Sequence, residues 1–146
     1  MAKKTRKAQV VICGYDAQSQ SLAYLLMQTN KKRGQFWQNV TGKIDPGESY
    51  EEGALREVVE ETALKPEWLI HFIDLKLSHE FIDQRNRDCH ENCYLAIVDR
   101  LYKVKIDPHE HQDHKWEKEI SRDSVLHQGN FEALEKAIKL IQEEFN

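Results

Sequence analysis

The chain has 146 residues, which suits a single domain covering residues 1–146. Apolar residues make up 40%, charged residues 32%, and the net charge is −4, so a broad nucleic-acid-binding surface is not expected. An acidic protein can still bind a phosphate-bearing small molecule, because bound cations reverse the local sign of the site. No apolar run approaches the ~18 residues that cross a bilayer. The basic start is followed by an apolar run too short for a secretion signal, so a cytoplasmic protein that does not contact membranes is expected.

The first third of the chain is typical of a β-hairpin followed by short extended segments. Residues 9–14 and 22–28 are rich in strand-forming residues and are separated by a polar stretch, which predicts the hairpin. A basic loop is then expected over residues 29–35, an extended segment over 36–40, and a loop over 42–47 that contains the turn-forming pair Pro46-Gly47.

A helix with a well-marked start follows this loop. Ser49 can cap it, and Glu52 three residues later completes a capping box. Helical spacing persists to about Thr62, and Pro66 disfavours continuation beyond Lys65.

The second half predicts strands and a final helix. Strands are expected around residues 70–77 and 93–98, with 102–106 as a further candidate. The polar residues 79–92 predict a hairpin loop or an irregular strand end, and 107–114 a charged, histidine-rich loop. The order of elements suggests an α+β or layered α/β/α domain around a mixed sheet.

The final helix is expected to begin near Asn130, which can act as a cap. Apolar residues then recur at steps of three and four, which predicts a helix packed on the core, with partner binding as the alternative. The residues of this stripe are Phe131, Leu134, Ile138, Ile141 and Phe145.

Three cysteines, Cys13, Cys89 and Cys93, do not suggest a disulfide framework, because their number is odd and no export signal precedes them. Cys89 and Cys93, with His90 between them, could belong to a zinc site. A structural zinc site normally needs a second ligand pair at a matching spacing. We therefore interpret the cysteines as reduced thiols.

Three glutamates of the middle helix fall on one side. At about 100° per residue, Glu57, Glu60 and Glu61 share an arc roughly 100° wide, apart from the face that can pack on a sheet. Three like charges this close weaken an isolated helix. Hard divalent cations offset such repulsion through oxygen ligands and also bind phosphate. A solvated acidic face is the alternative.

The loop before the helix favours the metal interpretation. Gly42 and Gly47 bracket a tight turn at the helix start, where the backbone can approach a site closely. Glu48 suits the positive end of the helix dipole. A backbone carbonyl at this place could add a metal ligand.

Residues 42–64 resemble the Nudix box: Gly, five residues, Glu, seven residues, then Arg-Glu-apolar-any-Glu-Glu-any-Gly-apolar. The positions filled in register are Gly42, Glu48, Arg56, Glu57, Val58, Glu60, Glu61 and Leu64. Ala63 stands where the pattern has Gly, beyond the carboxylates, so this departure affects the turn rather than the metal. The resemblance implies the Nudix fold, an α+β, α/β/α sandwich around a mixed β-sheet with a loop–helix–loop motif.

The same resemblance implies a hydrolase that uses Mg²⁺, or Mn²⁺ in its place, to cleave a phosphoanhydride bond. Glu57, Glu60 and Glu61 would bind the metal with the Gly42 carbonyl. The metal would neutralise the diphosphate and lower the pKa of a bound water that attacks phosphorus. The remaining roles implied are orientation of the glutamates by Arg56 and support of that network by Glu48.

A further glutamate often comes from a downstream loop in this family, and Glu110 is our candidate. Metal-bound carboxylates are weak bases, so a separate one is better placed to take the proton from water. Glu91 and Asp113 are the competing candidates, and an ordinary surface position for Glu110 is the alternative. The loop histidines are interpreted as solvated side chains near substrate phosphate rather than as a metal trio: His109, His111 and His114.

Residues 36–42 resemble the segment before the box in dihydroneopterin-triphosphate and dATP pyrophosphohydrolases. Similar downstream features are Glu110-His111 followed by Lys115-Trp116, and Asn130 with Ala133 and Glu135. We therefore expect a small nucleoside-triphosphate-like substrate, with release of pyrophosphate. Trp37, Lys43 and Arg33 are expected to contact it, the alternatives being a core position for Trp37 and a solvated loop around Arg33.

Other functions remain open. Dinucleoside polyphosphates, nucleotide sugars or 5′-triphosphate RNA are alternative substrates, and the acidic net charge counts against RNA. A catalytically silent nucleotide sensor would not need every carboxylate of the box, so the full set favours an enzyme. The oligomeric state is left open.

Overall fold

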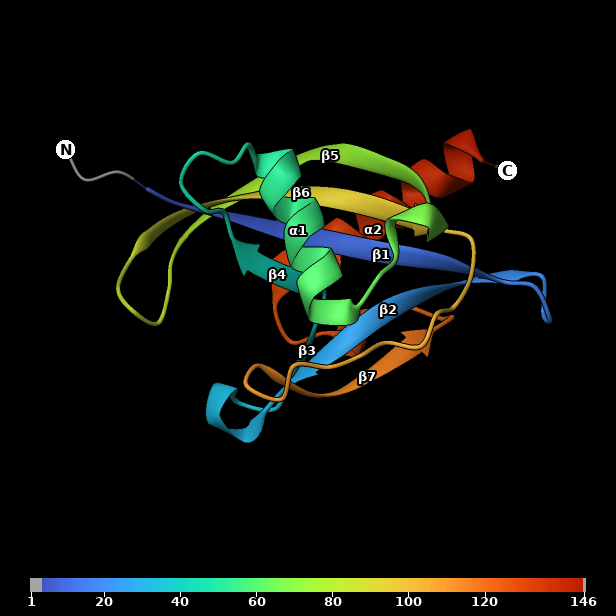
Figure 1. The fold of residues 1–146 in the computed structure, drawn as a ribbon, viewed down its shortest axis with the longest axis horizontal. Helices are drawn as coiled ribbons and strands as arrows, with labels where there is room; N and C mark the ends of the chain where they lie inside the picture. Colours follow the sequence, from blue (N-terminus) through green and yellow to red (C-terminus); the bar gives the residue numbers. More distant parts are fainter. Residues whose placement is uncertain (1–3, 146) are drawn as a thin grey trace.

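The computed structural model describes residues 4–145. A seven-stranded mixed sheet lies between two α-helices, with α1 over one face and α2 over the other (Figure 1). The strands are β1 (Thr5–Asp16), β2 (Ser21–Thr29), β3 (Trp37–Gln38), β4 (Val40–Lys43), β5 (Leu69–Ile82), β6 (Asp88–Val98) and β7 (His111–Glu117). The helices are α1 (Tyr50–Thr62) and α2 (Gln128–Glu144), with short 3₁₀ turns η1 (Lys31–Arg33), η2 (Pro66–Trp68) and η3 (Arg122–Ser124).

The sheet is built around β1, which pairs along one edge with β6 in parallel. Along its other edge β1 pairs antiparallel first with β4 and, further along, with β2. β2 then continues away from β1 to pair with β3 and β7. This divergence leaves room for β4 in the middle of the sheet, where Gly42 lies opposite Ala8. The loop that follows β4 therefore starts at the centre of the α1 face.

Two apolar cores occupy the two faces because side chains alternate along each strand. Ala8, Val10 and Ile12 of β1 pack with Ala54 and Val58 of α1. Val11 and Cys13 point to the other core, with Ala133, Leu134, Ala137 and Ile141 of α2. The predicted α/β/α sandwich is confirmed.

The start and end of α1 are as predicted. The Ser49 hydroxyl accepts a hydrogen bond from the Glu52 amide at 3.1 Å, and the Glu52 carboxylate accepts one from the Ser49 amide at 2.9 Å. After Thr62, Ala63 adopts the left-handed conformation (φ 61°, ψ 30°), and its amide donates to the Val59 carbonyl. The position where the Nudix pattern has glycine therefore has the backbone conformation that favours glycine.

Three segments differ from the sequence expectations. Residues 79–92, expected as a hairpin loop or an irregular strand end, continue the paired strands β5 and β6, and only residues 83–87 form the hairpin loop. Residues 102–106 form no strand, whereas residues 111–114, expected in a loop, belong to β7 (His111–Glu117), which pairs with β2. Polar side chains on both strand faces conceal such pairs, because the backbone ladder does not need an apolar face.

The predicted cap of α2 is also wrong. The helix begins at Gln128, after His127, which makes no side-chain capping bond. Asn130 is buried instead, and its Oδ1 accepts a hydrogen bond from the Asn39 amide at 2.7 Å. The buried stripe is Ala133, Leu134, Ala137 and Ile141, while Phe145 is 46% exposed. The alanines face the sheet, which turns the larger residues Phe131 and Ile138 towards the edge of the core.

Within residues 4–145, neither helix combines the length and apolar character that crossing a membrane requires.

Replacing Ala63 by glycine should stabilise the protein. The left-handed conformation costs an alanine roughly 1–2 kcal/mol, and the greater freedom of glycine in the unfolded chain returns part of this gain. We expect a net stabilisation of about 1 kcal/mol and a rise of roughly 3 °C in Tm for a chain of this size. Ala54→Gly, in the buried middle of α1, is the matched control and should lower Tm. A lower Tm for Ala63→Gly would contradict the expectation.

Candidate active site

Arg56 joins the loop after β4 to the acidic side of α1. Its guanidinium donates to Glu48 at 2.7 and 2.9 Å, to Glu57 at 3.0 Å and to Glu60 at 3.1 Å, and also to the Lys43 carbonyl at 3.0 Å. The hydrogen bond from Arg56 lowers the pKa of Glu48, which stays ionised. The arginine thus fixes two glutamates of the helix and the backbone of the loop in one frame.

Arg6 of β1 completes this frame from below the loop. Its guanidinium donates to the Glu48 carbonyl at 2.7 Å and to the Asp45 carbonyl at 3.0 Å. The Glu48 carboxylate in turn accepts from the Asp45 amide at 2.8 Å. Sequence reasoning missed Arg6, because its role depends on the β1–β4 pairing and no local pattern marks it.

Gly42 lies directly against the side chain of Glu57. A Cβ atom at this position would overlap the Glu57 carboxyl group. Only glycine lets the β4 backbone and the carboxyl group come this close. The structure therefore places the backbone of Gly42 beside one of the three predicted metal ligands.

Glu61 is buried, with 6% of its surface exposed, and its Oε2 has no hydrogen-bond partner. Glu61 was expected to point away from the face that packs on the sheet; it is nevertheless buried, and Glu110 and His111, from a distant segment, lie beside it. Ligand atoms of Glu61, Glu110 and His111 all lie within 4.8 Å of one another. Glu110, distant in sequence, therefore lies at the carboxylates of α1.

Burial and repulsion between carboxylates shift the pKa values of the groups in this site. Burial, with the nearby Glu110 carboxylate adding to it, raises the pKa of Glu61 far above its usual range. Burial also raises the pKa of Glu57, against the opposing effect of Arg56. Burial lowers the pKa of His111, which packs in β7 with its Nε2 3.3 Å from Gln38 Nε2. The expectation of a solvated His111 is wrong, whereas His109 is exposed.

The other predicted residues divide between the two faces of the sheet. The positive charge of Arg33, in η1, opposes the rise in the pKa of Glu61 and adds to the lowering of the pKa of His111 by burial. Lys43 is exposed at the end of β4. Trp37 is not brought to the carboxylates: it packs on the α2 side, with Lys115 Nζ 4.4 Å from its ring centre. Its neighbour Gln38 points to His111 instead, because side chains alternate along β3.

Glu91 also lies on the far face. Its carboxylate accepts from Gln9 at 2.9 Å and lies 3.2 Å from His79, in the layer between the sheet and α2. Since the sheet separates it from α1, Glu91 does not reach Glu57 or Glu61.

The carboxylate cluster suits a divalent cation. Three carboxyl groups, from Glu57, Glu61 and Glu110, interact electrostatically in a partly buried place, and the buried Oε2 of Glu61 has no hydrogen-bond partner there. Arg56 is hydrogen-bonded to Glu48, and its positive charge offsets the negative charge only on the outer side of the cluster. Oxygen ligands of this kind match Mg²⁺, Mn²⁺ or Ca²⁺.

Comparison with known proteins identifies the family and the fold. Residues 4–135 match the NUDIX domain family. Among solved structures, the chain is similar to an Ap4A hydrolase of C. elegans in a binary complex, with 21% identity, a TM-score of 0.77, and coverage of 95% of this chain and 98% of that chain. It is also similar to the NUDIX domain of Shewanella oneidensis NrtR complexed with ADP ribose, with 23% identity and a TM-score of 0.76. This match covers 97% of this chain and 90% of that chain. The dihydroneopterin triphosphate pyrophosphohydrolase of E. coli is 23% identical to this chain, with a TM-score of 0.72. This match covers 94% of this chain and 99% of that chain.

A curated relative matches a shorter part of the chain. It is an octanoyltransferase of Myxococcus xanthus, 40% identical over 57 residues. These residues make up 39% of this chain and 15% of that protein, so the similarity covers a small part of the relative. The solved structures share the fold, and the family match rests on residues 4–135.

Replacing Glu61 by glutamine should stabilise the metal-free protein, increasingly so at higher pH. Because its pKa is raised in the folded state, the folded protein holds a proton that the unfolded chain has released above the ordinary value of 4.5. Stability therefore falls as pH rises through this range, and the neutral amide removes that loss. We expect Glu61→Gln to melt above wild type at about pH 8, with the difference shrinking towards about pH 4.5.

Thermal melts in chelator across this pH range measure the effect. Glu60→Gln is the control, because the Glu60 side chain is 59% exposed and its replacement should change Tm only slightly. If Tm of the wild type at about pH 8 equals or exceeds Tm of Glu61→Gln, repulsion between the carboxylates at this site is not destabilising.

Proposed function

The chain belongs to the Nudix domain family, and from this premise we propose that it uses Mg²⁺ to hydrolyse a nucleoside-triphosphate-like small molecule to pyrophosphate and a monophosphate. The observation that carries the proposal is the assembly of the box carboxylates Glu57 and Glu61 with Glu110 from a distant segment. A sensor that only binds a nucleotide has no need of a separate carboxylate at this place.

The proposed metal ligands are Glu57, Glu60 and Glu61, with the carbonyl of Gly42. When bound, the divalent cation neutralises charge on the diphosphate and makes water more acidic. Arg56 has the supporting role: it holds Glu57 and Glu60 through one nitrogen, while Glu48 fixes the opposite side of its guanidinium. The carboxylates are thereby kept in place before a substrate arrives, which reduces the reorganisation needed during the reaction.

Glu110 is the proposed proton acceptor. It approaches Glu61 from the segment before β7 rather than from α1. The amide of Asn30 donates to the Glu110 carbonyl at 3.1 Å, and the Asn30 side chain donates to the His109 carbonyl at 2.9 Å. These bonds hold the backbone at Glu110 against η1, so the carboxylate is on a supported loop.

Cations near the cluster are the proposed contacts for phosphate. Arg33 follows Asn30 in η1, and its amide donates to the Asn30 side chain at 3.1 Å. The same asparagine therefore fixes both Arg33 and the Glu110 segment. Lys43 lies at the outer end of β4, next to the loop that Arg56 holds. Trp37, on the other face, is proposed to act on the substrate only through the placement of Gln38.

Two substrate classes compete. The resemblance of residues 36–42 favours pterin or purine triphosphates, whereas the similarity to an Ap4A hydrolase keeps dinucleoside polyphosphates as the second candidate. Both need the same cluster, and the products distinguish them.

Product analysis with Mg²⁺ tests the substrate proposal. Pterin, purine and pyrimidine triphosphates should be compared with diadenosine tetraphosphate and ADP-ribose at equal concentrations. We expect pyrophosphate and a monophosphate from at least one triphosphate, at a higher kcat/KM than for the dinucleotide. Release of orthophosphate alone, or a clear preference for the dinucleotide, would overturn the assignment of the triphosphate class.

Glu110→Gln tests the proton acceptor. Turnover should fall at least tenfold, the apparent substrate affinity should be nearly unchanged, and the acidic limb of the pH–rate profile should shift, because the amide cannot accept a proton. Asp113→Asn is the control, since Asp113 is exposed in β7 close in sequence. Glu91→Gln is a second control on the opposite face. Wild-type turnover in Glu110→Gln with a crippled Glu91→Gln would reverse the assignment.

A further inference from the structure

A second group of metal-ligating side chains lies on the α2 face of the sheet. His79 of β5 is paired directly with Glu91 of β6, and Cys93 follows two residues further along β6. Since strand side chains alternate, Glu91 and Cys93 point to the same face, where a cross-strand neighbour is within reach. Nitrogen, oxygen and sulfur ligands therefore converge from two adjacent strands.

The distances match those of a tetrahedral zinc site. His79 Nδ1 lies 3.2 Å from Glu91 Oε1 and 3.7 Å from Cys93 Sγ, and the ligand atoms of all three are within 4.8 Å. With Zn–N near 2.0 Å and Zn–S near 2.3 Å, tetrahedral ligand atoms are separated by roughly 3.2–3.8 Å. Two edges of the tetrahedron already have this length.

Groups around the three ligands complete the arrangement. His79 Nε2 lies 3.0 Å from the carboxylate of Glu132, and metal-bound histidines characteristically donate their second N–H to such a group. Gln9 Nε2 lies 2.9 Å from Glu91 Oε1 and 3.7 Å from Cys93 Sγ. Asn39 donates to Gln9 Oε1 at 2.7 Å, which fixes the amide with its donor towards the anions.

Zn²⁺ could replace two protons in this cluster without changing its net charge. Without metal, His79 carrying both ring protons satisfies Glu91 and Glu132, and Cys93 is a thiol. Zn²⁺ would replace the Nδ1 proton and the thiol proton, so the net charge of the cluster does not change. Binding therefore leaves the buried Glu91 compensated, which limits the cost of burying the ion.

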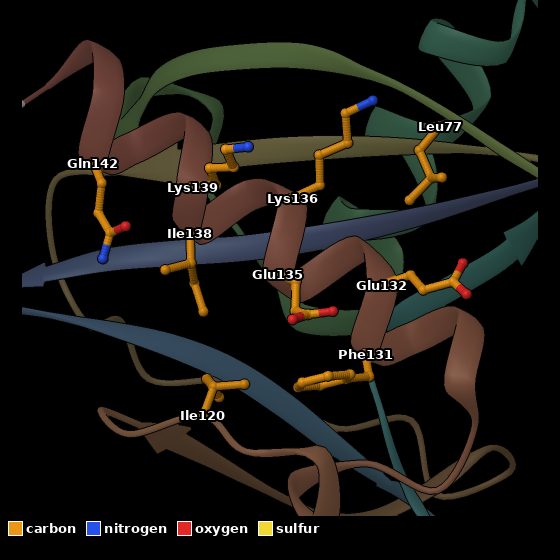
Figure 2. A pocket seen from close by; sticks show the side chains of 9 residues that line it. All are labelled: Leu77, Ile120, Phe131, Glu132, Glu135, Lys136, Ile138, Lys139 and Gln142. Carbon is orange, nitrogen blue, oxygen red and sulfur yellow. The ribbon is translucent and has the colours of Figure 1, made fainter.

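The cluster borders the surface at Glu132. This residue lines a shallow groove along α2 together with Leu77, Phe131 and Lys136 (Figure 2). The His79 side chain is 19% exposed and the Glu132 side chain 42%. The partly exposed His79 and Glu132 mark the side from which an ion would enter, and water would supply the fourth ligand.

We propose that His79, Glu91 and Cys93 bind Zn²⁺, with Glu132 holding the histidine. The site differs from the cysteine pair considered in the sequence, because His90 points to the opposite face and packs against Tyr50. Imidazole and thiolate ligands select zinc over magnesium, so the two faces of the sheet take different ions. The ion would fasten the β5–β6 hairpin and, through Glu132, the start of α2.

Cobalt substitution tests this site independently of catalysis. Chelator-treated protein titrated with Co²⁺ should show sulfur-to-cobalt charge-transfer absorption in the near ultraviolet, which ions at the all-oxygen carboxylates of α1 cannot produce. Cys93→Ser should lose the absorption. Cys89→Ser is the matched control: Cys89 is buried on the same strand, but its Sγ donates to the Arg87 carbonyl at 3.4 Å.

A melting experiment gives a second readout. With excess Mg²⁺ present to fill the carboxylates of α1, one equivalent of Zn²⁺ should raise Tm of wild type and Cys89→Ser by several degrees and leave Tm of His79→Asn and Cys93→Ser unchanged, whatever their own stability. Absence of the charge-transfer absorption in wild type with excess Co²⁺, or its retention in Cys93→Ser, would overturn the proposal. So would an equal zinc-induced shift in His79→Asn.

Discussion

Carboxylates held close together and away from water place the main constraint on the α1 face. Ionised carboxyl groups lose solvation when buried and repel each other, so a fold that gathers Glu57, Glu61 and Glu110 loses stability in doing so. Arg56 relieves the outer part of the cluster through Glu48, Glu57 and Glu60. In the inner part, the free Oε2 of Glu61 has no hydrogen-bond partner within the described residues, and the charge of Arg33 offsets only a small part of the rise in the pKa of Glu61. The cluster therefore suits a cation that is not part of the chain, which would relieve the repulsion that destabilises the metal-free fold.

The divergence of β1 and β2 makes this gathering achievable. If β2 ran along β1 for its whole length, β4 could not enter the sheet beside Ala8, and Gly42 would not lie under Glu57. The same divergence sends β2 outward to pair with β7 and brings the residues before β7 over the end of α1. One feature of sheet topology thus supplies both the glycine of the box and the distant glutamate.

Sequence reasoning succeeded where the signal is local. The capping box at Ser49, the side of the helix shared by the glutamates, and the special turn at Ala63 depend on neighbours within four residues. Features that depend on pairing could not be obtained in this way. The polar β5–β6 extension looks like a loop because its ladder is made by the backbone. The burial of Glu61 and His111 follows from a segment nearly fifty residues downstream of α1, and no helical periodicity encodes such a contact.

The wrong cap of α2 shows how the two faces of the sheet are connected. Asn130 does not cap the helix; its Oδ1 and carbonyl oxygen both accept from Asn39, and Asn39 also donates to Gln9. Gln9 donates to Glu91, which contacts His79, and His79 reaches back to α2 at Glu132.

These contacts form a closed ring that leaves the helix at residue 130 and returns at 132, passing through β1, β5, β6 and the link between β3 and β4. The first turn of α2 is therefore held by these polar contacts in place of a side-chain cap, although the buried Oδ1 of Asn39 has no hydrogen-bond partner within the described residues. Asn39 precedes β4 directly, so the ring that anchors α2 on one face also fixes the strand that positions Gly42 on the other.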